Sequence, residues 1–163
     1  MRPHPIMGTS SVRLLHGCHR LQGPILENGI VPDYDHTARS YDQLWTDMQK
    51  TDVREDGKVW DMYSSTTDFT FSSDQCGNYS GEGSCYNREH SFPKSWFNKA
   101  SPMYTDLFHL YPTDGYVNNR RSNYPFGETN GEQYKSNGGF SKLGKCTTPG
   151  YSGTVFEPND EYK

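Results

Sequence analysis

Two cysteines, Cys76 and Cys85, flank the run GNYSGEGS, in which three of eight residues are glycine. Glycine adopts backbone conformations that other residues avoid, so this run can turn the chain back and bring the two thiols together. We therefore expect a disulfide between Cys76 and Cys85, which favours an oxidising compartment. The alternative is a pair of reduced thiols in a cytosolic protein. Cys18 and Cys146 show no pattern from which their pairing can be predicted.

The chain has 163 residues, the size of one ordinary domain. Only 31% of its residues are hydrophobic, yet 14% are aromatic and no long block of charge occurs. This composition indicates a polar, loop-rich globular protein whose core relies on Tyr, Phe and Trp, rather than a disordered chain. Residues 1–35 lack periodicity, and we interpret them as an irregular arm that precedes a folded domain over residues 36–163.

The acidic and basic residues are distributed unevenly along the chain. The formal net charge is −4, but residues 86–145 hold 8 Lys/Arg against 5 Asp/Glu, a net charge of +3. Residues 1–85 hold 7 Lys/Arg against 12 Asp/Glu. A basic stretch of this kind suits contact with phosphate groups, although chance composition would also produce it.

Hydropathy gives no sign of a membrane protein. No apolar run approaches the roughly 20 residues that span a bilayer. The segment SVRLLHGCHRL is too short and too polar for the core of a signal peptide. We expect a secreted or periplasmic protein whose signal peptide is not present in this chain, and which works as a monomer without membrane contact.

Two segments before the glycine-rich run have recognisable patterns. Residues 40–50, SYDQLWTDMQK, show helical spacing, with Ser40 as N-cap and Gln43 three positions on. We expect the apolar face of this helix to lie in the core; it consists of Tyr41, Leu44, Trp45 and Met48. Residues 56–64 are expected to form a turn at residues 56 and 57 followed by a short strand, and residues 68–72 a second short strand.

The second half of the chain contains one strand and one helix that bear on function. Pro93 should end the strand that CYNREHSF forms, just after an Arg-Glu-His triple. Asp114 is a good N-cap for a short helix through GYVNNRRS. Residues 127–153 hold seven glycines and are expected to form surface loop with one strand, and residues 152–158 a last strand.

The ionisable residues near these two elements suit the hydrolysis of a phosphodiester. That reaction needs a base for water, a cation at the leaving oxygen and positive charge at the phosphate, which histidine, Mg²⁺ and arginine supply. Mg²⁺ usually takes one or two protein ligands, so the carboxylate of Glu89 and the amide oxygen of Asn118 would suffice. Adjacent strand residues point to opposite faces, so Glu89 and His90 can both serve only if the strand breaks or twists there.

Two longer blocks place this set in a known context. NREHSFPKSWF and TDLFHLYPTDGYVNNRRSNYPFGE resemble the signature blocks of the endonuclease I family, secreted or periplasmic nucleases of the ββα-metal (His-metal finger) superfamily. The resemblance extends from about residue 40 to the C-terminus. Members of the family generally continue past FEPNDEYK, so the domain is expected to be truncated at its C-terminus.

The resemblance implies an α+β fold with a ββα-metal core. It also implies a largely sequence-nonspecific endonuclease that cleaves DNA, with RNA as a second candidate, to 5′-phosphate products using one Mg²⁺, Mn²⁺ or Ca²⁺ ion. His90 matches the general base, and Glu89 and Asn118 match the metal ligands. Arg121, or Arg120 beside it, matches basic residues that steady the scissile phosphate.

Two further residues have supporting roles in this interpretation. His109 falls where related sequences carry a polar His or Asn, so it would orient the loop of His90; the alternative is a buried histidine bonded to backbone. Asp106 is expected to fix a neighbouring loop or helix end.

Two other functions remain open from the sequence. The set Cys76, Cys85, His90 and His109 has the composition of a structural Cys₂His₂ zinc site, although its spacing fits no common zinc module. The many aromatic residues could instead form the platform of a non-catalytic secreted binding module, but core packing explains them more simply.

Overall fold

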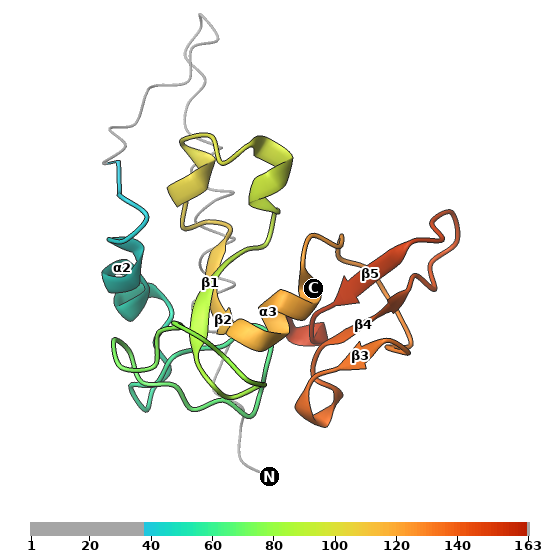
Figure 1. Ribbon diagram of the computed structural model, residues 1–163, viewed down its shortest axis with the longest axis horizontal. Helices are drawn as coiled ribbons and strands as arrows, with labels where there is room; N and C mark the ends of the chain where they lie inside the picture. The colour runs from blue at the N-terminus through green and yellow to red at the C-terminus, as the bar shows by residue number, and fades with distance from the viewer. Residues whose placement is uncertain (1–37, 163) are drawn as a thin grey trace, which may run out of the picture.

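Two antiparallel strands and a helix form the centre of the computed structural model, which describes residues 38–162 (Figure 1). Strand β1 (Tyr86–His90) pairs along its whole length with β2 (Leu110–Asp114), and helix α3 (Gly115–Arg121) follows β2 directly. All five residues of β2 are buried. The expected strand before Pro93 and the expected helix after Asp114 are both confirmed.

The junction between β2 and α3 is built by local interactions. The Asp114 carboxylate accepts hydrogen bonds from the backbone N–H groups of Tyr116 and Val117, both at 2.9 Å, and so caps the helix. The N–H of Gly115 donates to the carbonyl of Cys85 at 2.9 Å. A Cβ atom at position 115 would overlap the sulfur of Cys76, so only glycine lets α3 begin this close to the disulfide.

The bond between Cys76 and Cys85 is present, with the two Cα atoms 4.9 Å apart, and confirms the expected pairing. Cys146 carries a free thiol. Cys18 and the arm expected over residues 1–35 lie outside the described residues.

A second, three-stranded sheet lies on the other side of the hairpin from α2 (Figure 1). It is antiparallel in the order β3 (Tyr134–Lys135), β4 (Lys142–Lys145) and β5 (Thr154–Glu157). The last strand was expected. The interval before it was expected to hold one strand but contains two, because a glycine-rich turn of 3₁₀ helix, η3 (Asn137–Gly139), folds the chain back between β3 and β4.

Helix α2 (Leu44–Thr51) buries Leu44 and Met48. Ser40 and Gln43 form the expected reciprocal cap: the Ser40 N–H donates to Gln43 Oε1 at 2.8 Å, and the Gln43 N–H donates to Ser40 Oγ at 3.2 Å. Regular helix starts only at Leu44 because a turn occupies the residues before it. The remaining helical elements of residues 38–162 are three short 3₁₀ turns, η1 (Lys94–Phe97), η2 (Met103–Thr105) and η4 (Asp160–Tyr162).

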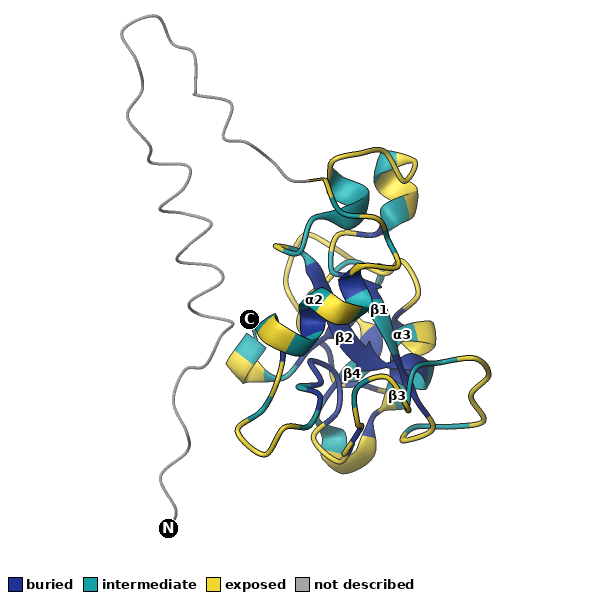
Figure 2. Cartoon of the chain, turned by 90° about the vertical axis from the view of Figure 1, so that its left-hand side faces the viewer, coloured by how far each residue is buried: buried dark blue, intermediate teal, exposed yellow. Residues whose placement is uncertain are grey.

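The core is centred on aromatic side chains, as the composition predicts. Tyr63, Tyr86 and Phe156 have no exposed surface. Buried residues concentrate on β1, β2 and the inner face of α3, whereas α2 keeps an exposed outer face (Figure 2).

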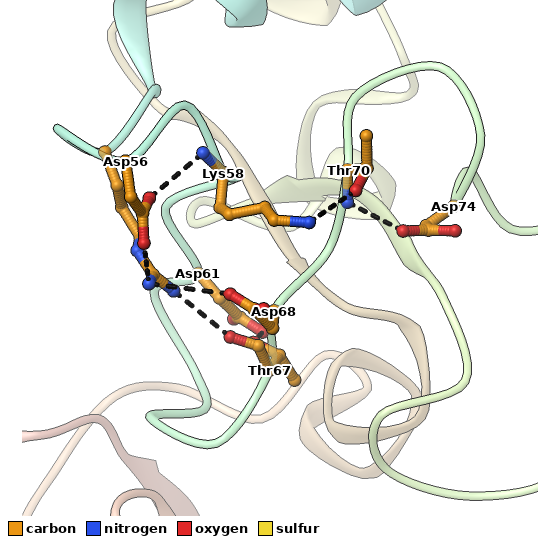
Figure 3. Close-up of polar contacts among 8 residues, drawn as sticks. Asp56, Lys58, Asp61, Thr67, Asp68, Thr70 and Asp74 are labelled. Carbon is orange, nitrogen blue, oxygen red and sulfur yellow. Dashed lines mark hydrogen bonds and ion pairs between the residues drawn. The ribbon is translucent and has the colours of Figure 1, made fainter.

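The strands expected at 56–64 and 68–72 are wrong. The first forms only an isolated bridge, between Val53 and Val59, and the second has no strand pairing. Side chains take the place of a ladder here (Figure 3). Lys58 Nζ donates to Thr70 Oγ1 at 2.8 Å, and the Thr70 N–H donates to the carboxylate of Asp74 at 2.7 Å. The second of these bonds joins residues four positions apart, and local side-chain bonds of this kind compete with regular strand pairing.

A buried carboxylate ties this irregular segment to the start of α3. Asp61 accepts hydrogen bonds from the N–H groups of Tyr63, Ser64 and Asp114 and from the hydroxyl of Thr67, at 2.8, 3.2, 3.0 and 2.7 Å. Asp61 thus links this segment to the residue that caps the helix.

None of the helices in the described part of the chain has the length and apolar character that crossing a bilayer requires.

Candidate active site

His90 is the last residue of β1, and its imidazole is held by one main-chain contact. The Nε2 atom lies 3.1 Å from the carbonyl oxygen of Tyr104. A carbonyl oxygen only accepts hydrogen bonds, so Nε2 carries the proton and Nδ1 keeps its lone pair. Burial lowers the pKa of His90 to about 4, which keeps the ring neutral near pH 7. The imidazole is therefore ready to accept a proton through Nδ1.

Glu89 is buried beside His90 and is held by two donors. The Tyr63 hydroxyl donates to Glu89 Oε1 at 2.8 Å, and Arg121 Nη1 donates to the same oxygen at 2.5 Å. Neither donor uses the second carboxylate oxygen. Burial raises the pKa of Glu89 to about 7, against the lowering effect of Arg121 and Tyr63. Tyr63 was not predicted as a site residue, because nothing near it in the sequence suggests contact with position 89.

Arg121 lies on α3 and is only 1% exposed. Besides the ion pair with Glu89, its guanidinium donates to the carbonyl oxygens of His90 and Ser91 at 2.9 and 2.6 Å. It also lies over the ring of Phe126, 4.6 Å from the centroid. These contacts bind the helix to the end of β1 and place the charge of Arg121 against Glu89.

Arg120 points in another direction. It is exposed, its guanidinium carbon lies 4.8 Å from the ring centroid of Tyr116, and Nη2 donates to the Tyr116 hydroxyl at 2.5 Å. Arg120 does not line the pocket described below.

Asn118 lies one turn before Arg121 on the same face of α3, as its spacing predicts. Its Nδ2 atom donates to Asn87 Oδ1 at 2.7 Å. Asn87 and Glu89 are two residues apart on β1, so their side chains lie on the same face of the strand. This bond orients the Asn118 side chain with its nitrogen towards the strand, so Oδ1 is the atom that could bind a metal ion.

One pocket of about 450 Å³ collects these groups. Both Glu89 and His90 line it, although β1 pairs regularly with β2 through His90 and shows no break between these two neighbours. The polar side chains that line it are Asn87, Arg88, Glu89, His90, Lys94, Asn118, Asn119, Arg121, Ser122 and Asn123. Three cations and one carboxylate make it suited to an anion.

His109 and Asp106 lie outside this lining. The carbonyl of His109 accepts from the N–H and hydroxyl of Ser91, at 2.9 and 3.2 Å. The ring centroids of His109 and His90 lie 5.8 Å apart. Asp106 accepts from the N–H of Phe108 at 2.9 Å and so shapes the turn before β2.

The donors in the pocket suit one class of metal ion. Within residues 38–162 no three His, Cys, Asp or Glu side chains gather as a metal site. Glu89 and Asn118 together offer two oxygen ligands, the number that Mg²⁺ commonly takes from a protein while keeping its waters. The zinc alternative is wrong, because Cys76 and Cys85 are bonded to each other and cannot act as thiolate ligands.

A neutral histidine, a buried carboxylate and a helix-borne amide around a pocket with three cations are groups that suit the hydrolysis of a phosphate ester. The family model described as Endonuclease I matches residues 25–163. The chain belongs to the endonuclease I family, a family of phosphodiester hydrolases. No curated protein and no solved structure gave a significant match to the chain. Family membership supports an enzyme over the binding-module alternative.

Proposed function

We propose that this protein is a divalent-metal-dependent, largely sequence-nonspecific endonuclease that hydrolyses DNA, with RNA as a second candidate, to 5′-phosphate products. Residues 36–163 would form the nuclease domain, and β1, β2 and α3 its ββα-metal core. The observation that carries the proposal is the convergence of His90, Glu89 and Asn118 on one pocket that is lined by cations.

The chemistry follows from the protonation and position of each group. His90 Nδ1 takes the proton from the attacking water, because Nε2 is already protonated and bonded to Tyr104. Glu89 and Asn118 would hold one Mg²⁺, Mn²⁺ or Ca²⁺ ion, which when bound supplies positive charge at the leaving 3′-oxygen. Arg121 favours the ionised form of Glu89 against the effect of burial and fixes its carboxylate in place. The expectation that Arg121 or Arg120 steadies the scissile phosphate applies better to Arg121, which lines the pocket.

The substrate would be bound mainly through its phosphate backbone. The charged and amide side chains of the pocket suit phosphate oxygens, which carry no sequence information. Affinity should therefore fall steeply with salt and show little base preference. The disulfide agrees with a secreted or periplasmic location, which we propose on that basis together with the family.

Plasmid nicking tests the proposal. The wild type is incubated with supercoiled plasmid in EDTA, and then with Mg²⁺, Mn²⁺ or Ca²⁺ added in excess. We expect nicking only with a metal, and a loss of about 10²–10⁴-fold in rate for His90→Ala. Asn118→Ala should need a much higher metal concentration. Circular dichroism confirms that each variant is folded. Full nicking by His90→Ala, or by the wild type in EDTA, would refute the mechanism.

A further inference from the structure

Arg88, the first residue of the Arg-Glu-His triple, lines the same pocket but has no part in the mechanism above. Its surroundings differ from those of Arg121. Arg121 forms an ion pair with the buried carboxylate of Glu89, with 2.5 Å between nitrogen and oxygen. Within the described residues, Arg88 forms only a longer ion pair, 3.6 Å, with the carboxylate of Asp42. The Asp42 side chain is 93% exposed, so water screens its charge. The positive charge of Arg88 is therefore only weakly compensated by a neighbouring carboxylate.

Arg88 is nevertheless held firmly. Its guanidinium carbon lies 3.7 Å from the ring centroid of Tyr41 and 4.1 Å from that of Trp45, and Nη1 donates to the carbonyl oxygen of Tyr41. Stacking on aromatic rings fixes a guanidinium without neutralising it. Tyr41 and Trp45, expected in the core, are half-buried: they pack against the core clusters and also contact this cation.

The position of Arg88 relates it to the candidate base. Arg88 and His90 are two residues apart on β1, so they share a strand face and their Cα atoms lie about 7 Å apart. A nucleic-acid strand with its scissile phosphate at His90 would pass Arg88 one nucleotide further along. The in-plane N–H groups of a guanidinium match phosphate oxygens.

We propose that Arg88 is a substrate-binding residue that holds the backbone phosphate next to the scissile one, with Tyr41 and Trp45 fixing its guanidinium. This inference rests on the proposed nuclease function and adds a second phosphate position to it. The contact is made before and during the reaction, so it contributes to substrate binding rather than to the chemical step.

The first test measures binding without cleavage. A fluorescein-labelled DNA duplex is titrated with protein in EDTA at several KCl concentrations, and affinity is followed by anisotropy. Arg88→Gln keeps a planar group that donates to the Tyr41 carbonyl but removes the charge, and Arg88→Lys keeps the charge. The slope of log affinity against log salt is negative. We expect it to become shallower by about 0.9 for Arg88→Gln and to stay unchanged for Arg88→Lys. Arg54→Gln is the control, because Arg54 lies outside the pocket and pairs with Asp56 and Asp68.

The second test separates binding from chemistry. With Mg²⁺ present, Arg88→Gln should raise KM about tenfold while kcat stays within about threefold, because a uniform binding contact has been lost. An unchanged salt slope, while the wild type still nicks DNA, would show that Arg88 only packs α2 against β1. A loss of kcat as large as that of His90→Ala, at unchanged KM, would overturn the flanking position. Failure of the wild type to cleave or bind DNA would instead refute the proposed function itself.

Discussion

The Nε2 atom of His90 lies 3.1 Å from the carbonyl oxygen of Tyr104, and this contact decides which ring nitrogen of the candidate base is free. Tyr104 belongs to the segment between β1 and β2, which extends beyond the strand ends (Figure 1). The same segment continues directly from β1, so the base and the group that orients it come from one excursion of the chain.

The tautomer of His90 can be observed directly. In protein labelled with ¹⁵N at histidine and held at pH 7 in EDTA, we expect the His90 ring to be neutral and protonated at Nε2. Correlation spectra that connect the ring nitrogens to the carbon-bound protons report this, and the His90→Ala spectrum identifies the signals. Protonation at Nδ1 would remove the free base from the proposed mechanism.

The two neighbouring arginines of α3 should differ sharply in their effect on stability. Arg121→Ala leaves the buried Glu89 carboxylate without its cation, which should lower the free energy of unfolding by about 3–5 kcal/mol. Arg120→Ala removes an exposed side chain and should change stability little. Urea unfolding followed by circular dichroism measures both. Equal effects for the two variants would contradict the contact between Arg121 and Glu89.

The disulfide should contribute measurably to stability. A loop as short as that between Cys76 and Cys85 is expected to stabilise the fold by about 2–3 kcal/mol through the unfolded chain. The double variant Cys76→Ser/Cys85→Ser should lose this amount in urea unfolding. Reductant should weaken the wild type to a similar degree and leave the double variant unchanged. A wild type that is indifferent to reductant would argue against the bond.

Asp61 should give stability a distinctive dependence on pH. Burial raises the pKa of Asp61 to about 7, although hydrogen bonds from Tyr63, Thr67 and Asp114 act in the opposite direction. In the unfolded chain the carboxyl loses its proton near pH 4, so between about pH 4 and 7 the folded state binds more protons. Stability from this group is therefore full below pH 4 and declines as pH rises to 7.

Asp61→Asn isolates that contribution. The difference in free energy of unfolding between the wild type and the variant should fall as pH rises from 4 to 7, by an amount on the order of 4 kcal/mol, and then level off. Urea titrations at half-unit pH steps supply the curve. A difference that stays constant across this range would show that the carboxyl is ionised throughout.

The elements predicted correctly are those whose signals are local. The cap at Asp114, the reciprocal pair Ser40 and Gln43, and the disulfide each depend on residues within a few positions of one another. The strand before Pro93 was also predicted, since proline restricts the residue before it. Structural features that depend on residues close together in the sequence can be predicted from that sequence.

The errors arise where distant contacts decide the structure. At 56–64 nearby bonds such as that between Asp61 and the N–H of Tyr63 compete with strand pairing, and Asp61 also accepts from the N–H of Asp114, 53 positions away. The contact of Arg121 with Glu89 spans 32 positions, and a resemblance between sequence blocks states that both matter without stating that they touch. The ion pair with Glu89 was not predicted, whereas the phosphate role expected for Arg121 stays a prediction.

The guanidinium of Arg121 bonds at once to the carboxylate at 89 and to the backbone at 90 and 91. The two signature blocks consequently behave as a single interlocked part. Loss of the side chain at either position 89 or position 121 should therefore loosen the attachment of the other block as well.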